Sequence, residues 1–122
     1  MSAKVLVIDD SMMVRKQVGQ ALSGAGFSVI EATDGVDALQ KLTTSPDTRL
    51  VVCDVNMPRM SGLEFLEALR KAENTANLPV VMLTTEGQPE LVQRAKALGA
   101  KGWIVKPFKP DLLVAAAKKL TA

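Results

Sequence analysis

Short apolar runs alternate five times with stretches whose apolar residues recur at helical spacing, and this alternation constrains the fold more than any other feature of the chain. The runs are rich in β-branched residues, which is typical of strands that are covered on both faces. They are predicted as strands at residues 5–8, 29–30, 50–53, 80–83 and 103–105. With short connections between the elements, this order predicts an α/β fold in which helices cover both faces of a parallel sheet.

Each predicted strand is followed by a predicted helix. Asp34 is placed to begin the second helix, and Ser61 with Glu64 forms a capping box that begins the third. Gly99 is placed to end the fourth helix. The apolar residues that mark the five helices are Val14, Val18, Leu22 and Ala25; Ala38, Leu39 and Leu42; Phe65, Leu66 and Leu69; Leu91, Ala95 and Leu98; and Leu112, Leu113, Ala116 and Leu120.

The residue types that the chain lacks exclude several classes of function. Its 122 residues include no histidine and a single cysteine, Cys53. Without histidine there is no Ser-His-Asp or Cys-His catalysis and no His-ligated zinc, and one cysteine cannot form an internal disulfide. The sequence has no secretory signal and no apolar run long enough to span a bilayer, so we expect a cytoplasmic protein without membrane insertion.

The basic residues are unevenly distributed. The formal net charge is +2, but residues 86–122 hold seven Lys or Arg against three acidic residues. A solvated surface explains this distribution, and so does a surface that attracts an acidic partner. We do not expect nucleic-acid binding, because the basic residues form no dense run and aromatic residues are scarce.

Polar side chains follow four of the predicted strands at their carboxyl ends. Asp9 and Asp10 follow the first strand, Asp54 the third, Thr84 the fourth and Lys106 the fifth. The carboxyl ends of parallel strands meet at one edge of the sheet, where open α/β folds bind their ligands. We therefore expect three carboxylates, a hydroxyl and an ammonium group at one rim.

This set of groups indicates phosphoryl transfer. Crowded carboxylates repel one another without a counter-charge, and Mg²⁺ takes oxygen ligands from carboxylates and phosphates. Lys106 and Thr84 can hold phosphoryl oxygens, and the carboxylate of Asp54 can form an aspartyl phosphate. Alone, each residue has a simpler explanation as a helix cap, a strand end or a surface lysine, and only their occurrence together favours the chemistry.

Four segments carry a resemblance to a known family. They are Val7-Ile8-Asp9-Asp10-Ser11, Asp54-Val55-Asn56-Met57-Pro58 with Ser61-Gly62, Leu83-Thr84-Thr85 and Lys106-Pro107-Phe108. In this order and at this spacing, they resemble the receiver domains of bacterial response regulators, in particular the single-domain chemotaxis (CheY-like) type. The resemblance covers the whole chain. It implies one receiver domain over residues 1–122 with a flavodoxin-like (βα)5 fold and strand order 2-1-3-4-5.

The resemblance also implies roles for the rim residues. Asp54 would take the phosphoryl group from a histidine kinase. Asp10 and Asp54 would bind Mg²⁺ together with the backbone carbonyl of Asn56, and Asp9 would act mainly through a metal-bound water. Lys106 would contact the phosphoryl group, and its peptide bond to the following proline is expected to be cis.

The resemblance further implies a switch. Thr84 would move toward the phosphoryl oxygens and let an aromatic residue of the last strand turn inward. That residue is normally Tyr or Phe, but here it is Trp103, which a role as a large core residue explains equally well. Asn56 and Glu86 occupy positions that tune the lifetime of the phosphoryl group in this family. They match the chemotaxis type, which has a short-lived signal, although both also suit exposed loops.

The implied partners are a histidine kinase, a downstream protein and a phosphatase, and the protein itself is expected to be a monomer. We expect the downstream partner to bind the surface formed by residues 91–98, 103–105 and 112–120. If 122 residues is the natural length, no output domain follows the last helix, and we expect control by binding, as in chemotaxis or motility.

Two other functions stay open: a degenerate receiver that binds partners without phosphorylation, and an Mg²⁺-dependent phosphohydrolase that uses Asp54. The short loops disfavour the hydrolase, because they leave no substrate-binding insertion. A nucleotide-binding loop is excluded, because neither G-x-x-x-x-G-K-[ST] nor G-x-G-x-x-G occurs.

Overall fold

Strands and helices alternate along the chain as the sequence predicts. The computed structural model describes residues 3–57, 59–84 and 89–122. The elements are β1 (Lys4–Ile8), α1 (Met12–Gly24), β2 (Ser28–Ala32), α2 (Gly35–Thr44), β3 (Thr48–Asp54), α3 (Gly62–Lys71), β4 (Val80–Thr84), α4 (Pro89–Ala97), β5 (Gly102–Val105) and α5 (Pro110–Thr121). No described helix has the length and apolar character needed to cross a bilayer.

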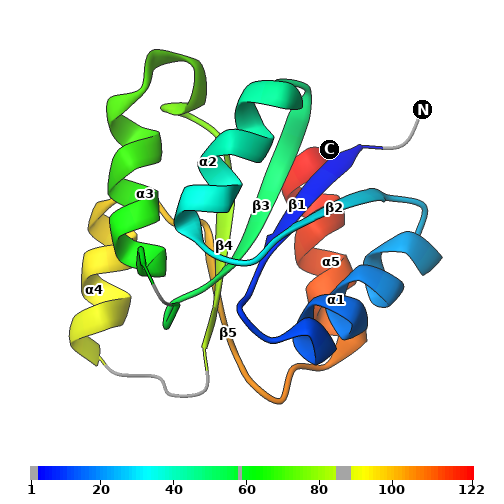
Figure 1. The fold of residues 1–122 in the computed structure, drawn as a ribbon. Coiled ribbons are helices and arrows are strands. Elements are labelled where there is room, and N and C mark those ends of the chain that lie inside the picture. Colours follow the sequence, from blue (N-terminus) through cyan, green and yellow to red (C-terminus); the bar gives the residue numbers. More distant parts are fainter. Residues whose placement is uncertain (1–2, 58, 85–88) are drawn as a thin grey trace.

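All five strands belong to one parallel sheet with the order β2-β1-β3-β4-β5 (Figure 1). This confirms the predicted fold class and strand order. The register brings the strand ends together, because Ile8 pairs with Cys53 and Asp54 pairs with Leu83. Thr84 in turn pairs with Val105. The residues that follow these strands therefore lie along one rim of the sheet.

The side chains of the central strands alternate between two apolar layers. Val5 and Val7 of β1 pack on the side of α1 and α5, while Leu6 and Ile8 pack on the side of α2, α3 and α4. Figure 1 shows the two sets of helices on opposite faces of the sheet. All four residues are at most 1% exposed. Burial of each such side chain contributes about 1.5–3 kcal/mol, so these layers supply most of the stabilisation of the sheet.

The predicted helix ends are confirmed. The Ser61 hydroxyl accepts a hydrogen bond from the Glu64 N–H at 3.2 Å, and Glu64 Oε1 accepts one from the Ser61 N–H at 3.1 Å. Asp34 begins α2 by accepting a hydrogen bond from the Asp37 N–H at 2.9 Å. Gly99 follows α4 with a φ of +83°, a conformation that favours glycine.

Some boundaries differ from the prediction. β2 extends over Ser28–Ala32 and β3 begins at Thr48, because backbone pairing continues past the apolar residues that marked these strands. A short 3-10 helix, Glu73–Thr75, was not expected from the sequence. α5 buries Leu113 and Ala117, whereas Leu112 is 61% exposed.

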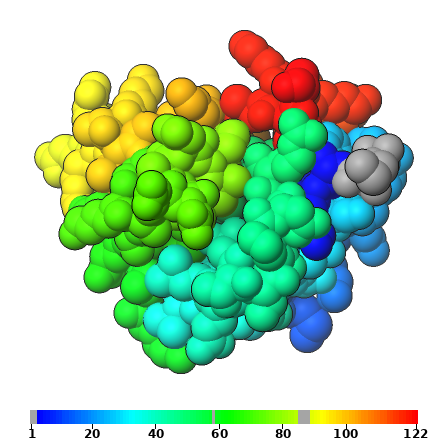
Figure 2. Space-filling model, turned by 90° about the horizontal axis from the view of Figure 1, so that it is seen from above, coloured from blue at the N-terminus to red at the C-terminus, as the bar shows by residue number. Residues whose placement is uncertain are grey.

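Polar contacts join distant parts of the chain at the end of the molecule opposite the rim. Figure 2 views the molecule from this end, with the last turn of α5 in red. Arg49 donates a hydrogen bond to the Thr121 carbonyl at 2.9 Å, and Lys4 lies 3.0 Å from Asp47. Exposed ion pairs contribute about 0–1 kcal/mol each, so the apolar layers matter more for stability.

Candidate functional site

Three carboxylates meet at the rim where β1 and β3 end. Asp9, Asp10 and Asp54 each place a carboxylate oxygen within 4.8 Å of the others. Asp9 is 1% exposed and Asp54 is 5% exposed, while Asp10 lies at the surface. The structure thus brings together the three acidic residues that the strand order predicts at one rim.

Lys106 extends into this cluster from the end of β5. Its ammonium nitrogen lies 2.8 Å from Asp9 Oδ2 and 3.4 Å from Asp54 Oδ1. The backbone N–H of Lys106 donates to the Thr84 carbonyl at 2.6 Å, which holds the ends of β4 and β5 together. The peptide bond between Lys106 and Pro107 is cis, as expected. Thr84 is 1% exposed, so all the rim residues except Asp10 are largely shielded from water.

The three carboxylates of the cluster outnumber its single ammonium group, Lys106. Burial raises the pKa of Asp54, and the neighbouring Asp9 charge raises it further, while Lys106 only partly offsets both effects. Burial by itself lowers the pKa of Lys106, but its hydrogen bond to Asp9 and the charges of Asp54 and Asp9 together raise it. Ionisation of Asp54 is therefore disfavoured relative to a carboxyl group in water, and a bound cation would offset this effect.

The donor atoms fit a hard divalent cation such as Mg²⁺. Such ions prefer carboxylate and carbonyl oxygens, which are the groups gathered at this rim. Asp9 already uses both carboxylate oxygens: Oδ1 accepts from the Ser11 N–H at 2.9 Å, and Oδ2 accepts from Lys106. Asp54 also accepts a hydrogen bond from the Asn56 N–H, but Lys106 lies farther from Asp54 (3.4 Å) than from Asp9 (2.8 Å), so Asp9 has the closer competing cation.

Comparison with known proteins settles the family. Residues 5–118 match the family described as the response regulator receiver domain. The chain belongs to this family. This receiver is 40% identical to the chemotaxis protein CheY1 of Helicobacter pylori over 111 residues, which cover 90% of each chain. It is 45% identical to the chemotaxis protein CheY of Treponema pallidum over 107 residues, or 86% of this chain and 73% of that protein.

A solved structure supports the same conclusion. The chemotaxis protein CheY4 of Vibrio cholerae is similar to this receiver with a TM-score of 0.92 and 42% sequence identity. The match covers 98% of this chain and 99% of that one. The resemblance to CheY-like receivers, first identified from short motifs, therefore extends over the fold as a whole.

The remaining predicted residues of this receiver differ in their surroundings. Asn56 is exposed, and its backbone N–H hydrogen-bonds to Asp54. Trp103 is partly buried against the apolar layer on the side of α2, α3 and α4. Its indole nitrogen is buried without a hydrogen-bond partner among the residues that the structure describes. Glu86 lies outside the described residues.

Sequence reasoning missed two arginines that contact the receiver site indirectly. Arg15 donates to the backbone carbonyl of Asp9 at 2.7 Å and to Glu31 at 3.1 Å. Arg59 holds Asp34 through two hydrogen bonds, of 2.8 and 3.1 Å. Only their positions in the sequence could have indicated these contacts, because Arg15 lies in the helix after the acidic pair and Arg59 lies five residues after Asp54.

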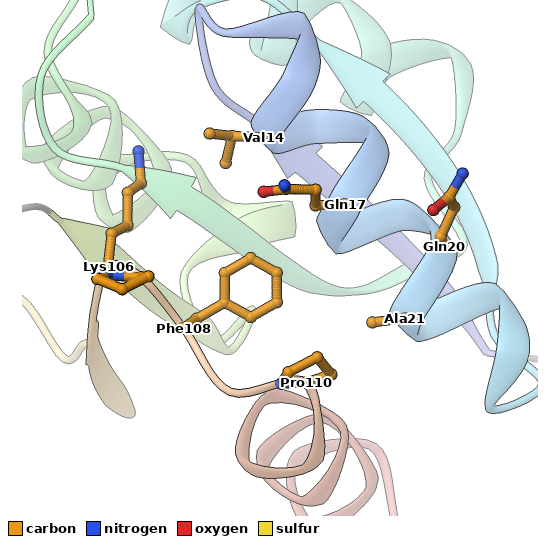
Figure 3. A pocket seen from close by; sticks show the side chains of 8 residues that line it. Val14, Gln17, Gln20, Ala21, Lys106, Phe108 and Pro110 are labelled. Atoms are coloured by element: carbon orange, nitrogen blue, oxygen red, sulfur yellow. The ribbon is translucent and has the colours of Figure 1, made fainter.

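A hollow of about 780 Å³ opens beside the receiver site, between α1 and residues 106–110. Figure 3 shows the Phe108 ring directed toward α1, while the Lys106 ammonium points away from the hollow. Its lining residues are Val14, Gln17, Gln20, Ala21, Lys106, Pro107, Phe108 and Pro110. The hollow is thus a largely apolar surface next to the acidic cluster, and it is not itself the cation site.

Proposed function

We propose that this receiver accepts a phosphoryl group on Asp54 from a histidine kinase, with Mg²⁺ bound, and thereby changes its affinity for a downstream protein. The arrangement that carries the proposal is the Lys106 ammonium 3.4 Å from Asp54 Oδ1, beside the carboxylates of Asp9 and Asp10. A nucleophilic carboxylate flanked by a lysine and further oxygen ligands suits phosphoryl transfer.

In the transfer, an Asp54 oxygen attacks phosphorus, an O–P bond forms and the P–N bond to the kinase histidine breaks. The Asp54 side chain is 7% exposed, which limits the access of competing water. Lys106 then stabilises negative charge on the phosphoryl oxygens. The Thr84 hydroxyl lies at the neighbouring strand end and would donate a hydrogen bond to the group.

The cation would be held by Asp10, Asp54 and the backbone carbonyl of Asn56, with Asp9 acting through a bound water. When bound, Mg²⁺ supplies positive charge that offsets the carboxylates and the incoming phosphoryl oxygens. The closer approach of the Lys106 ammonium to Asp9 (2.8 Å) than to Asp54 (3.4 Å) supports this division of roles.

Phosphorylation would act by shifting a pre-existing equilibrium between two conformers. Thr84 and Trp103 would couple the site to the surface of α4, β5 and α5. This surface carries exposed Lys96, Lys101 and Lys119, which favours an acidic partner. Charge reversal of these lysines is expected to weaken partner binding, and unchanged affinity would contradict this part of the proposal.

The names of the relatives suggest the pathway. Since these relatives are chemotaxis proteins, we infer that this receiver acts as a cytoplasmic signalling protein in chemotaxis or motility control, with a kinase, a downstream target and a phosphatase as partners. It would carry a phosphoryl group and lose it by hydrolysis, without turning over external substrates. Asn56 and Glu86 would set the lifetime of the phosphoryl group.

Intact-mass measurement after incubation with acetyl phosphate and Mg²⁺ tests the proposal. We expect one added phosphoryl mass that requires Mg²⁺ and is absent from Asp54→Asn. If no adduct forms, beryllofluoride binding is followed by the fluorescence of Trp103, the only tryptophan. A beryllofluoride response would indicate rapid loss of the phosphoryl group, and no response would favour a degenerate receiver that acts as a binding module.

A further inference from the structure

We propose that Arg59 is a positioning residue, and that its ion pair with Asp34 holds the loop between β3 and α3 in the conformation that binds Mg²⁺. The inference rests on the proposed function, because it concerns the same cation site. The described parts of this loop are residues 55–57 and 59–61, and they contain Asn56, whose carbonyl is a proposed ligand. Neither Arg59 nor Asp34 belongs to the acidic cluster itself.

The contact between the two residues is specific. Arg59 Nε donates to Asp34 Oδ2 at 2.8 Å, and Nη2 donates to Asp34 Oδ1 at 3.1 Å. Paired hydrogen bonds of this kind fix orientation as well as distance. The Asp34 side chain is only 6% exposed, and it also caps α2 through the Asp37 N–H. The carboxylate is thus anchored in the fold and provides a fixed point for the loop.

The loop conformation requires such a fixed point. Arg59 has a φ of +62° and is the one non-glycine residue with positive φ among those that the structure describes. This conformation is unfavourable for a residue with a Cβ unless other contacts stabilise it. The next residue, Met60, packs closely over Gly35, where a Cβ would lie 2.7 Å from the Met60 sulfur. Two consecutive loop residues therefore contact the N-terminal end of α2, Arg59 at its cap residue Asp34 and Met60 at Gly35.

The two ends of the loop are held by the sheet and by α3. The Val55 N–H donates to the Leu83 carbonyl at 3.2 Å, and the Gly62 N–H donates to the Val55 carbonyl at 2.8 Å. Asn56 lies between these bonds and is exposed. Val55 anchors the backbone on one side of Asn56, and the contacts of Arg59 and Met60 with Asp34 and Gly35 anchor the other side of the loop. We infer that both anchors set the position of the Asn56 carbonyl.

The sign of the effect on Mg²⁺ binding separates positioning from simple electrostatics. Arg59 carries a positive charge, so its removal would strengthen cation binding if charge alone mattered. If Arg59 positions the loop, its removal weakens binding, because the carbonyl ligand is no longer held in place. Loss of a residue that orients metal ligands typically lowers metal affinity about 10–100-fold.

The test compares Mg²⁺ affinity, measured by titration calorimetry, in the full chain and three variants. Arg59→Gln removes both hydrogen bonds to Asp34 and the positive charge. Arg59→Lys keeps the charge but cannot make the paired hydrogen bonds of a guanidinium group. Arg94→Gln is the matched control, since Arg94 is 60% exposed against 59% for Arg59 and also faces an acidic residue, Glu67, at 3.5 Å. We expect about tenfold weaker binding for Arg59→Gln, an intermediate loss for Arg59→Lys and no change for Arg94→Gln.

Unchanged or tighter binding by Arg59→Gln would overturn the inference. A parallel measurement of hydrogen exchange in residues 55–62 gives a readout that does not depend on the metal. Faster exchange in Arg59→Gln but not in Arg94→Gln supports the positioning role, and equal exchange contradicts it. If the unmodified protein does not bind Mg²⁺, the proposed function fails, and the exchange measurement alone decides whether Arg59 holds the loop.

Discussion

The Lys106 ammonium donates its shorter hydrogen bond, 2.8 Å, to Asp9 and lies 3.4 Å from Asp54. The lysine therefore pairs most closely with buried Asp9, and it remains close to Asp54, the proposed phosphoacceptor. This arrangement separates two effects of Lys106, one on cation binding and one on phosphoryl transfer.

Replacement of Lys106 by Met is expected to change these effects in opposite directions. Mg²⁺ should bind several-fold more tightly, because a competing positive charge is removed from the carboxylates. The rate of labelling by acetyl phosphate should fall by about 100-fold, because a group that stabilises the transferring oxygens is lost. Titration calorimetry and a mass time course measure the two quantities. Lys109→Met, at an exposed lysine, is the control, and an unchanged labelling rate would contradict the assignment.

Asp54→Asn is expected to stabilise the fold near pH 7 in the presence of a chelator. The raised pKa of Asp54 means that the folded state disfavours the ionised carboxylate. The wild-type protein is therefore destabilised at pH values above the ordinary carboxyl pKa, and most above the raised one. The gain should be full at pH values above the raised pKa of Asp54. It should shrink as the pH falls below that pKa and vanish near the ordinary carboxyl pKa, where the wild-type group is neutral in both the folded and the unfolded state.

Urea unfolding from pH 4 to pH 8 checks this expectation. Asp111→Asn, at an exposed residue of α5, should show little change over the same range. A lower free energy of unfolding for Asp54→Asn at pH 7 would show that the carboxylate is stabilised in the fold.

Arg70→Met is expected to lower the free energy of unfolding by about 2–4 kcal/mol. Its guanidinium donates to five backbone carbonyls, which belong to Thr75, Ala76, Leu78, Leu98 and Gly99. The contacts join the end of α3, the start of β4 and the end of α4. Arg70→Lys keeps the positive charge and some of the hydrogen-bond donors, so its free energy of unfolding should fall by less. Urea unfolding measures both variants. Equal stability of the Met variant and wild type would mean that water replaces these hydrogen bonds.

Three glycine-to-alanine substitutions should differ in a defined order. A Cβ at Gly62 would collide with the backbone carbonyl oxygen of Asp54, so Gly62→Ala should reduce both stability and labelling of Asp54. At Gly35 the obstacle is the flexible Met60 side chain, and the loss should be smaller. At Gly24, at the end of α1, no atom lies within 4 Å of the added Cβ, and alanine should be neutral or stabilise by up to about 1 kcal/mol. Thermal unfolding with mass-detected labelling tests this order, which a larger loss at Gly35 than at Gly62 would contradict.

Trp103→Phe should change stability by about 1 kcal/mol or less. The smaller ring loses packing, but the substitution also removes a buried indole N–H that has no partner among the described residues, and such a group costs about 1–3 kcal/mol. Trp103→Leu, which loses the ring and its packing, is the comparison. Urea unfolding followed by circular dichroism measures both, since the substitutions remove the fluorescent reporter. A loss as large for Phe as for Leu would mean that the indole N–H is satisfied in solution.

The sequence by itself determined the order of the elements, the capping of α2 and α3, and the group of residues at the rim. These features follow from local patterns: apolar runs, helical spacing, and caps whose partners lie three residues apart, as for Ser61 and Glu64. Once the strands are parallel, the positions of Asp9, Asp54 and Lys106 at one rim follow from where each strand ends.

Only the tertiary structure decided which of these groups contact one another. Lys106 and Asp9 are 97 residues apart in the sequence, and Arg59 and Asp34 are 25 apart. Their pairing depends on strand register, loop path and side-chain rotamer, none of which leaves a periodic pattern in the sequence. The buried indole N–H of Trp103, which has no partner within the described part of the chain, has the same origin, because strands and helices that are distant along the chain build its surroundings.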